Sequence, residues 1–326
     1  MSQLLALPLL LALQVPSAPT SIPLPGEAPV AMDYLAFDPA THRVLLPAGN
    51  TGRLDVVDTT TGKLTALESF PTAKRGERTV GLSSVTVGEG SVFVGNRADW
   101  TVCALEQRSL AREGCVKLAS QPDGVMYVPA TKEVWVTLPE AHAMEVLDVK
   151  NPASPAVVAR VPLAGEPEGY ALDAARGLVY TNLEDADRTV VIDARARRVL
   201  DTWKPGCGEA GPRGLAFDAS HRQLAVACTD RVKLLDAAHA GAIRAELGTG
   251  GGVDNPAWDA AHHRLYVASG KTATLTIVDL SHAGELRKVA SAPTAQGGRN
   301  VAVDADGTAY VPDSRGGRLV VVRFPR

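Results

Sequence analysis

Residues able to bind ions recur at one position of a repeated sequence pattern. In each copy this residue stands directly before a position that is usually Gly or Asn, at the start of a short apolar run. The residues at this position are Asp33, Ser83, Asp123, Glu168, Arg213, Asp254 and Arg299. Carboxylates bind divalent cations, and guanidinium groups hold carboxylates or phosphates through paired hydrogen bonds. If the fold brings these positions together, they form a polar binding site.

The repeat that positions these residues has a period of about 44 residues. Its clearest copies are GYALDAARGLVYTN (169–182), GLAFDASHRQLAVA (214–227) and NPAWDAAHHRLYVA (255–268). Each copy has an apolar run ending in Asp, a polar turn and a second apolar run. Further runs with alternating aliphatic residues follow, such as RTVVID (188–193) and TLTIVD (274–279). This period-2 alternation between turn signals predicts four antiparallel strands in each copy.

Seven copies and the two chain ends together predict a closed ring. The last copy supplies only three strands before the chain stops at Arg326. SIPLPGEAP (21–29) resembles RVPLAGEPE (160–168), which is a fourth strand followed by the lead-in to the next copy. A chain-terminal strand that completes the last sheet removes the open edges of the array. We therefore predict one all-β domain over 21–326, a seven-bladed β-propeller with four-stranded antiparallel blades, closed by its N-terminal strand.

The repeated phrases also carry a family resemblance over residues 21–326. Copies containing YTN (180–182) and YVAS (266–269) resemble the YVTN repeats of the YncE-like seven-bladed propellers. The last copy, NVAVDADGTAYVPDSRGGRLVVVRF (300–324), is similar to an NHL repeat. The resemblance implies an exported bacterial propeller that binds something rather than catalysing a reaction. A shared fold alone does not specify function.

The N-terminus and the cysteines favour an exported protein. Residues 1–20 contain an apolar run too short to span a bilayer, followed by a Pro- and Ser-rich segment. This pattern predicts a signal peptide over 1–20, a periplasmic or secreted protein, and no transmembrane segment in the mature chain. The four cysteines form no CxxC or Cys/His cluster, so we expect two disulfides instead. The predicted pairs are Cys103 with Cys115, a short loop worth about 3 kcal/mol if closed, and Cys207 with Cys228.

Composition and histidine placement restrict the function classes. The net charge of −3 gives no sign of a basic surface, so nucleic acid is an unfavoured partner. His42, His221, His262 and His263 all fall in the turn between the first and second strands of a copy, on the rim opposite the seven residues. A catalytic triad based on His and a three-His metal site are therefore not expected. No phosphate-binding glycine motif opens a helix.

Three interpretations of the seven rim residues remain open. In the first, the signs alternate around the ring, so that Arg213 and Arg299 pair with acids on both sides and only stabilise the channel mouth. In the second, Arg213 and Arg299 bind a small anion. In the third, Asp123, Glu168 and Asp254 bind Ca²⁺ or Mg²⁺ with help from Asn182. The residues that leave the second strands on this rim are expected to be turn formers; they are Asn96, Arg97, Asn182, Ser269 and Asp313.

These interpretations give two functional hypotheses. The favoured one is a monomeric, non-catalytic binding or scaffold propeller that recognises an envelope protein, a glycan or a small anionic ligand and needs no cofactor. The alternative is a lactonase or lyase in which a divalent metal in the channel polarises a carbonyl or activates water. Arg213, between Glu168 and Asp254 in the sequence order, argues against a metal site because it competes with a cation.

Overall fold

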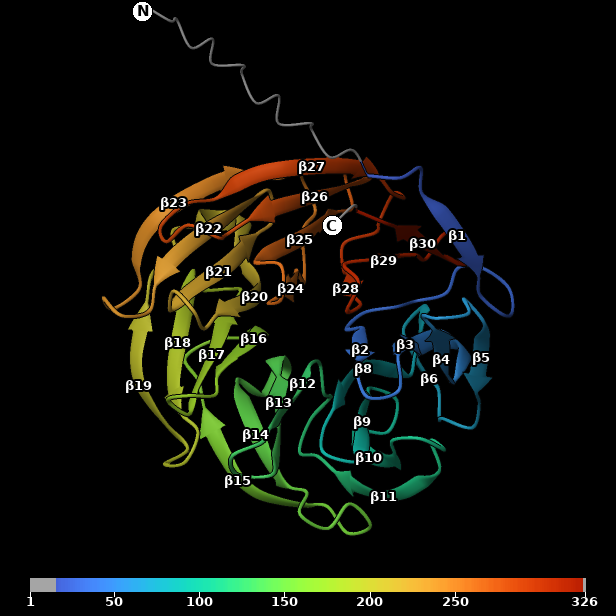
Figure 1. Cartoon of the computed structure of the whole chain (residues 1–326). Coiled ribbons are helices and arrows are strands. Elements are labelled where there is room, and N and C mark those ends of the chain that lie inside the picture. Colours follow the sequence, from blue (N-terminus) through green and yellow to red (C-terminus); the bar gives the residue numbers. More distant parts are fainter. Residues whose placement is uncertain (1–15, 325–326) are drawn as a thin grey trace, which may run out of the picture.

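Short apolar strands joined by tight turns form seven four-stranded antiparallel sheets arranged in a ring (Figure 1). The computed structural model describes residues 16–324. The predicted all-β propeller with seven blades is confirmed. Blades 1 to 3 contain β2 (Ala36–Asp38), β3 (Arg43–Ala48), β4 (Arg53–Asp58) and β5 (Leu64–Leu67); β8 (Leu82–Val87), β9 (Ser91–Asn96), β10 (Thr101–Glu106) and β11 (Arg112–Lys117); and β12 (Val125–Val128), β13 (Glu133–Leu138), β14 (Ala143–Asp148) and β15 (Ala156–Pro162).

The remaining blades continue in the same order around the ring. Blades 4 to 6 contain β16 (Pro167–Asp173), β17 (Leu178–Leu183), β18 (Arg188–Asp193) and β19 (Arg198–Trp203); β20 (Pro212–Asp218), β21 (Gln223–Cys228), β22 (Arg231–Asp236) and β23 (Ala242–Gly248); and β24 (Ala257–Asp259), β25 (Arg264–Ser269), β26 (Thr274–Asp279) and β27 (Arg287–Pro293). Blade 7 contains β28 (Ala302–Val303), β29 (Ala309–Asp313), β30 (Arg318–Val322) and the N-terminal β1 (Thr20–Pro23). Three short 3₁₀ turns are also present, namely η1 (Gly49–Thr51), η2 (Pro139–Ala141) and η3 (Gly208–Ala210).

The ring closes where the first strand joins the last blade. β1 pairs antiparallel with β30, in a register that places Ile22 opposite Leu319. The backbone N–H of Ser17 adds a hydrogen bond to the carbonyl of Arg323. The predicted closure by the N-terminal strand is therefore confirmed. The edge of β30 is covered by the chain's own beginning.

The apolar core is divided among the interfaces between neighbouring blades. Leu54 of blade 1 packs with Val92 of blade 2, and Tyr266 of blade 6 packs with Val311 of blade 7, in separate buried clusters. The second and third strands are almost fully buried, as in β13, because both of their faces contact a neighbouring blade. The outer strands are mostly exposed, with half-buried residues between exposed ones, as in β23. Each blade is thus held by the two beside it, which fixes the rim residues relative to one another.

The Asp that ends the first strand of most copies has a structural role. Asp38 Oδ1 accepts a hydrogen bond from the N–H of Ala40, and Asp218 Oδ1 accepts one from the N–H of Ser220. Asp58 and Asp193 make the same contact after the third strand. A carboxylate that caps the turn two residues later replaces a backbone hydrogen bond that the turn cannot make. These repeated aspartates therefore shape the turns rather than the binding site.

Both predicted disulfides are present. Cys103 and Cys115 face each other across β10 and β11, and Cys207 is joined to Cys228 at the end of β21. Most of the predicted signal peptide, residues 1–15, lies outside the described residues. Within residues 16–324, no helix has the length and hydrophobicity that a membrane crossing requires.

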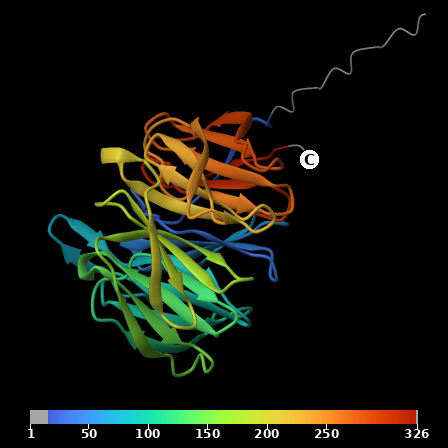
Figure 2. The same ribbon diagram turned by 90° about the vertical axis from the view of Figure 1, so that its left-hand side faces the viewer.

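One element has no counterpart in the repeat. A two-stranded hairpin, β6 (Ala73–Arg75) and β7 (Arg78–Val80), lies between the last strand of blade 1 and the first of blade 2. It projects beyond one face of the ring, in light blue at the left edge of Figure 2. The hairpin raises the wall of the channel mouth beside blades 1 and 2.

Candidate functional site

The predicted rim residues lie at the starts of the innermost strands. Asp33, Asp123, Asp254 and Arg299 each precede the first strand of a blade, while Ser83, Glu168 and Arg213 lie within β8, β16 and β20. Glu168 interacts electrostatically with Asp123, Asp254, Asp33 and Arg213. The Ser83 hydroxyl donates a hydrogen bond to the backbone carbonyl of Asp123, 3.0 Å away. The ring therefore brings residues from distant parts of the sequence to one mouth.

A chain of ion pairs crosses the mouth from blade 6 to blade 3. Arg299 Nε lies 3.0 Å from Asp254 Oδ2, and its Nη2 lies 3.9 Å from Asp33 Oδ1. Arg97 Nη2 lies 2.9 Å from Asp33 Oδ2 and also pairs with Asp123. Asp33 is fixed further by a hydrogen bond from the side-chain amide of Asn300. The carboxylates thus hold two guanidinium groups in defined positions at the mouth.

The predicted alternation gives direct ion pairs for Arg299, whereas Arg213 acts on Glu168 and Asp254 only through longer-range attraction. Arg213 forms an ion pair with Glu184, which follows β17, and no ion pair with Glu168 or Asp254 appears among the described residues. About a third of the Arg213 side chain is exposed, whereas Asp254 is buried. The pair with Glu184 lets the guanidinium keep its hydration at the rim, which burial beside Asp254 would remove.

Arg97 differs from the turn former predicted at its position. It follows Asn96 at the end of β9, where a turn former was expected, and instead links two of the predicted acids. Asn96 does shape the turn, because its side-chain oxygen accepts a hydrogen bond from the N–H of Ala98. The sequence does contain a sign of this role. The rim residues of blades 1 to 3 are Asp33, Ser83 and Asp123, so two acids follow each other around the ring with no cation between them.

Two stacked tyrosines lie below the ion pairs. Tyr34 precedes the first strand of blade 1 and Tyr170 belongs to β16 of blade 4, yet their ring centroids are only 5.6 Å apart, with nearly parallel planes. The Tyr34 hydroxyl donates to Asp123 Oδ2, and the Tyr170 hydroxyl donates to the carbonyl of Val125. Because these blades are three positions apart in the ring, the stacked pair crosses the central channel. Asp123, Glu168 and Asp254 act electrostatically on Tyr34. We call the two tyrosines and these three acids the floor of the mouth.

Burial and crowding of acids shift the pKa values at this floor. Desolvation raises the pKa of Asp254 to about 6, and the positive charge of Arg299 only partly offsets it. Burial, followed by the repulsion of Asp123 and Asp254, raises the pKa of Glu168 well above its usual range. Burial also raises the pKa of Asp123 against the opposing effect of Arg97. The floor therefore holds more carboxylate than its cations balance.

A cavity lies to one side of this floor, over blades 7, 1 and 2. It has a volume of about 620 Å³, in the range typical of small-molecule sites. Asp33, Arg97 and Arg299 reach it from the ion-pair chain, and Glu77 and Arg78 reach it from the β6–β7 hairpin. Counting the charged residues that line it, three arginines face two acids. Guanidinium groups therefore reach the wall of the cavity, although Arg97 and Arg299 are already paired with acids.

The proposed metal ligands do not converge. Asn182 is fully buried, its side-chain oxygen accepts a hydrogen bond from Thr189, and its side-chain nitrogen donates to the carbonyl of Arg213. Asp123 is engaged by Arg97 and Tyr34. Groups of three ligand-type residues occur elsewhere: in the described chain they are His142 with Glu166 and Asp185, and Asp218 with His221 and His263.

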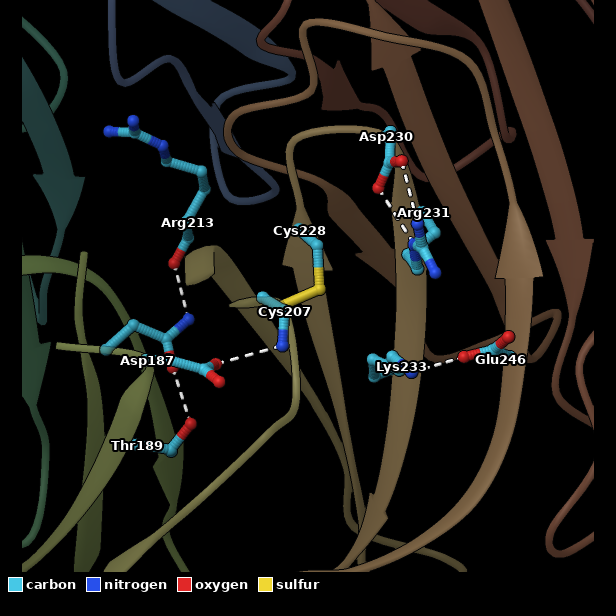
Figure 3. The surroundings of a disulfide bond; sticks show 10 residues. Asp187, Thr189, Cys207, Arg213, Cys228, Asp230, Arg231, Lys233 and Glu246 are labelled. Carbon is cyan, nitrogen blue, oxygen red and sulfur yellow. Dashed lines mark hydrogen bonds and ion pairs between the residues drawn. A yellow bond between two sulfur atoms is a disulfide. The ribbon is translucent and has the colours of Figure 1, made fainter. Parts of the chain in front are cut away.

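The second disulfide lies near the mouth on the side of blades 4 and 5. Figure 3 shows it joining the segment before β20 to the end of β21, close to Arg213 and Asp187. Asp187 accepts a hydrogen bond from the N–H of Cys207 at 2.9 Å. The disulfide thereby ties the lead-in of blade 5 to its second strand, and Arg213 lies between these two anchored points.

Comparisons with known proteins identify the fold. No family model matches the chain, and no curated protein matches it by sequence. Similar solved structures include a chain of Kuenenia stuttgartiensis hydrazine synthase, with a TM-score of 0.75 and 16% identity over 91% of this chain and 96% of that one. A chain of the mitotic checkpoint complex has a TM-score of 0.76 and 15% identity, covering 99% and 96%. The Myceliophteria thermophila Cps50 (Swd1) β-propeller domain has a TM-score of 0.71 and 13% identity, covering 95% and 99%. These neighbours show a seven-bladed, WD40-like propeller, while membership of the YVTN group stays a prediction.

Proposed function

We propose that this protein is an exported, non-catalytic binding propeller whose channel mouth recognises a small anion or an anionic group of a protein or glycan. The observation that carries the proposal is the cavity beside Asp33, whose lining includes Arg78, Arg97 and Arg299. A guanidinium has five N–H donors, so those of Arg97 and Arg299 retain donors beyond the ones that face the acids. Because the acids already hold these two side chains, an incoming anion meets donors that are largely ordered.

Two observations support export. The apolar segment within residues 1–20 fits a signal peptide, and both disulfides belong to the chemistry of oxidising compartments. A periplasmic or secreted location follows from this proposal, as does a mature chain that begins near residue 21. Mass spectrometry of the protein purified from its native host tests it, and an intact Met1 in the mature protein contradicts it.

A melting scan with a panel of anions tests the binding proposal. The probes are phosphate, sulfate, citrate and glucuronate, each compared at matched ionic strength. At least one should raise the melting temperature of the wild-type protein, because a ligand that binds only the folded state stabilises it. Arg299→Gln should reduce that shift by more than half, while Arg287→Gln, on an outer strand and paired with Asp279, should retain it. A panel with no shift, or equal shifts in both variants, argues against the proposal.

The metal-dependent lactonase or lyase stays a second candidate for one reason. The raised pKa values of Glu168 and Asp254 mark a floor with surplus negative charge that a cation would relieve. The residues fit such a metal poorly, since Asn182 is committed to other partners and Arg97 and Arg299 occupy the positions between the acids. Melting scans with Ca²⁺, Mg²⁺, Mn²⁺ or EDTA decide the matter: a shift that Glu168→Gln abolishes would favour this candidate.

A further inference from the structure

A second cluster of ligand-type side chains lies far from the channel mouth. Asp218 is the last residue of β20 and His221 lies in the turn that follows, whereas His263 lies in the equivalent turn of blade 6. Asp218 is five residues beyond Arg213 on the same strand, about 17 Å along it at the rise of a β-strand. The cluster is therefore on the opposite rim from the cavity, and what it binds is independent of the function proposed above.

The three side chains converge between two blades. One ligand atom from each of Asp218, His221 and His263 lies within 4.8 Å of the other two. His221 Nδ1 is 2.7 Å from Asp218 Oδ2, and the His221 and His263 ring centroids are 6.0 Å apart. The Asp218 carboxylate is also held by the N–H and hydroxyl of Ser220. A carboxylate oriented by such second contacts is a typical metal ligand.

The neighbouring blade provides an internal comparison. Asp259 and His262 repeat the Asp218–His221 pair, with the same 2.7 Å separation and nearly the same exposure. No third ligand joins them to complete a group of this kind within the described residues. His263, directly after His262, extends instead toward the pair in blade 5. The Asp–His pair is thus a turn feature of the repeat, and His263 is what distinguishes the cluster.

His263 also has an unsatisfied ring nitrogen. Its Nδ1 is buried and has no hydrogen-bond partner among the residues that the structure describes. A buried polar nitrogen without a partner costs about 1–3 kcal/mol, and such groups are few in native proteins. A ligand that binds Nδ1 would remove this cost.

We propose that Asp218, His221 and His263 bind one divalent transition-metal ion of the Zn²⁺ type, which links blades 5 and 6. Two imidazoles and one carboxylate suit borderline metals such as Zn²⁺ or Co²⁺, whereas Ca²⁺ and Mg²⁺ prefer sites made of oxygen ligands. Three protein ligands leave the fourth position of a tetrahedral site for water or an external group. The other grouping, His142 with Glu166 and Asp185, has only one imidazole among its three ligands.

Titration of the purified full chain with Zn²⁺ after chelator treatment tests this proposal. Calorimetry should give one tight site per chain, and Co²⁺ at the same site should produce visible absorption typical of tetrahedral coordination. His263→Gln and His221→Gln should each weaken Zn²⁺ binding by at least about tenfold. His262→Gln, the matched change in the pair without a third ligand, should leave it unchanged, as should His142→Gln.

A measurement on the wild-type protein keeps the proposal testable if a variant fails to fold. Diethyl pyrocarbonate modifies accessible histidines, and mass spectrometry of the peptides reports each one separately. Zn²⁺ should protect His221 while leaving the modification of His262 unchanged. Absence of Zn²⁺ binding, binding lost in His142→Gln instead, or equal protection of His221 and His262 would overturn the assignment.

Discussion

At the scale of single residues, Arg97 helps to hold the mouth together, because it is the cation shared by Asp33 and Asp123. Only 26% of its side chain is exposed, and both carboxylates are less exposed still. Arg97→Met removes the charge while keeping most of the volume, and leaves the buried Asp123 near the half-buried Asp33 without the cation that they share. We expect the free energy of unfolding to fall by about 2–4 kcal/mol, measured by urea denaturation.

An exposed ion pair serves as the control for Arg97→Met. Arg231 and Asp230 pair at the surface, with 42% and 48% of their side chains exposed. Arg231→Met should leave the free energy of unfolding nearly unchanged, since solvent screens such pairs. If the two variants lose the same stability, the ion pairs of Arg97 with Asp33 and Asp123 do not stabilise the mouth as proposed.

Asp254 gives a prediction about pH. Its folded-state pKa of about 6 lies above the ordinary value of 3.8 because of burial, so between these values the folded state binds more protons than the unfolded state. Its contribution to stability is therefore present below about pH 4 and is lost as the pH rises through about 6. Asp254→Asn does not titrate, so its stability relative to wild type should increase between pH 4 and pH 7. If the stability difference between Asp254→Asn and wild type stays constant or falls over this pH range, burial does not raise the pKa of Asp254.

The candidate site could be predicted only in part from these residues. The position before the Gly or Asn of each copy identified Asp33, Asp254 and Arg299 because strand starts converge on the channel axis in any closed ring. The partners could not be assigned in the same way, since side-chain direction decides them. Arg213 turns to Glu184 at the rim, and Arg97 enters from a strand end where the pattern indicated only a turn.

At the scale of elements, the inner strands approach each other so closely that glycine is required. A Cβ on Gly169 of β16 would lie 2.4 Å from the Cα of Gly214 in β20 and 2.6 Å from the carbonyl oxygen of Arg213. Both neighbours are backbone atoms and cannot rotate away. Gly169→Ala should therefore destabilise the protein by about 1–3 kcal/mol or more through overpacking, measured by chemical denaturation.

Gly248 offers the matched substitution on an outer strand. It ends β23, and an added Cβ would meet nothing within 4 Å. Gly248→Ala should change stability by no more than about 0.5 kcal/mol. Equal effects at the two positions would mean that blades 4 and 5 do not meet at the channel as closely as described.

The β6–β7 hairpin could not be predicted from the sequence, because it lies outside the repeat from which the other strands were predicted. The repeat identified the blade strands because their apolar residues alternate and recur, and burial between blades enforces that alternation. The segment from Ala73 to Val80 is mostly polar and has no counterpart in other copies. Nothing in its own pattern indicated pairing, yet it supplies Glu77 and Arg78 to the cavity.

At the scale of the whole molecule, closure by β1 should be essential to stability. A chain that begins at Leu24 lacks β1 and exposes the edge of β30, including the backbone that pairs with Ile22. We expect a lower melting temperature and concentration-dependent association, because an unpaired edge strand invites pairing with other chains. Size-exclusion chromatography and calorimetry measure both. A truncated chain that stays monomeric with unchanged melting would contradict the role given to β1.

The overall architecture was accessible from the sequence because the evidence for closure lies in both chain ends. The last copy lacks one strand, and the N-terminal segment matches a fourth strand. The two fit together only if the N-terminal segment pairs with the last copy, and Thr20–Pro23 does pair with β30. Ligand chemistry is not determined in the same way. Similar propellers at 16% identity or less share the fold alone, and the charge at the mouth depends on contacts specific to this chain.

A crystal structure of the protein with the anion that most raises its melting temperature tests the account of the mouth most directly. We predict electron density for the anion in the cavity of about 620 Å³, within hydrogen-bond distance of the Arg97 or Arg299 guanidinium. Density for the anion only at other surfaces, with this cavity empty at saturating concentration, would contradict it.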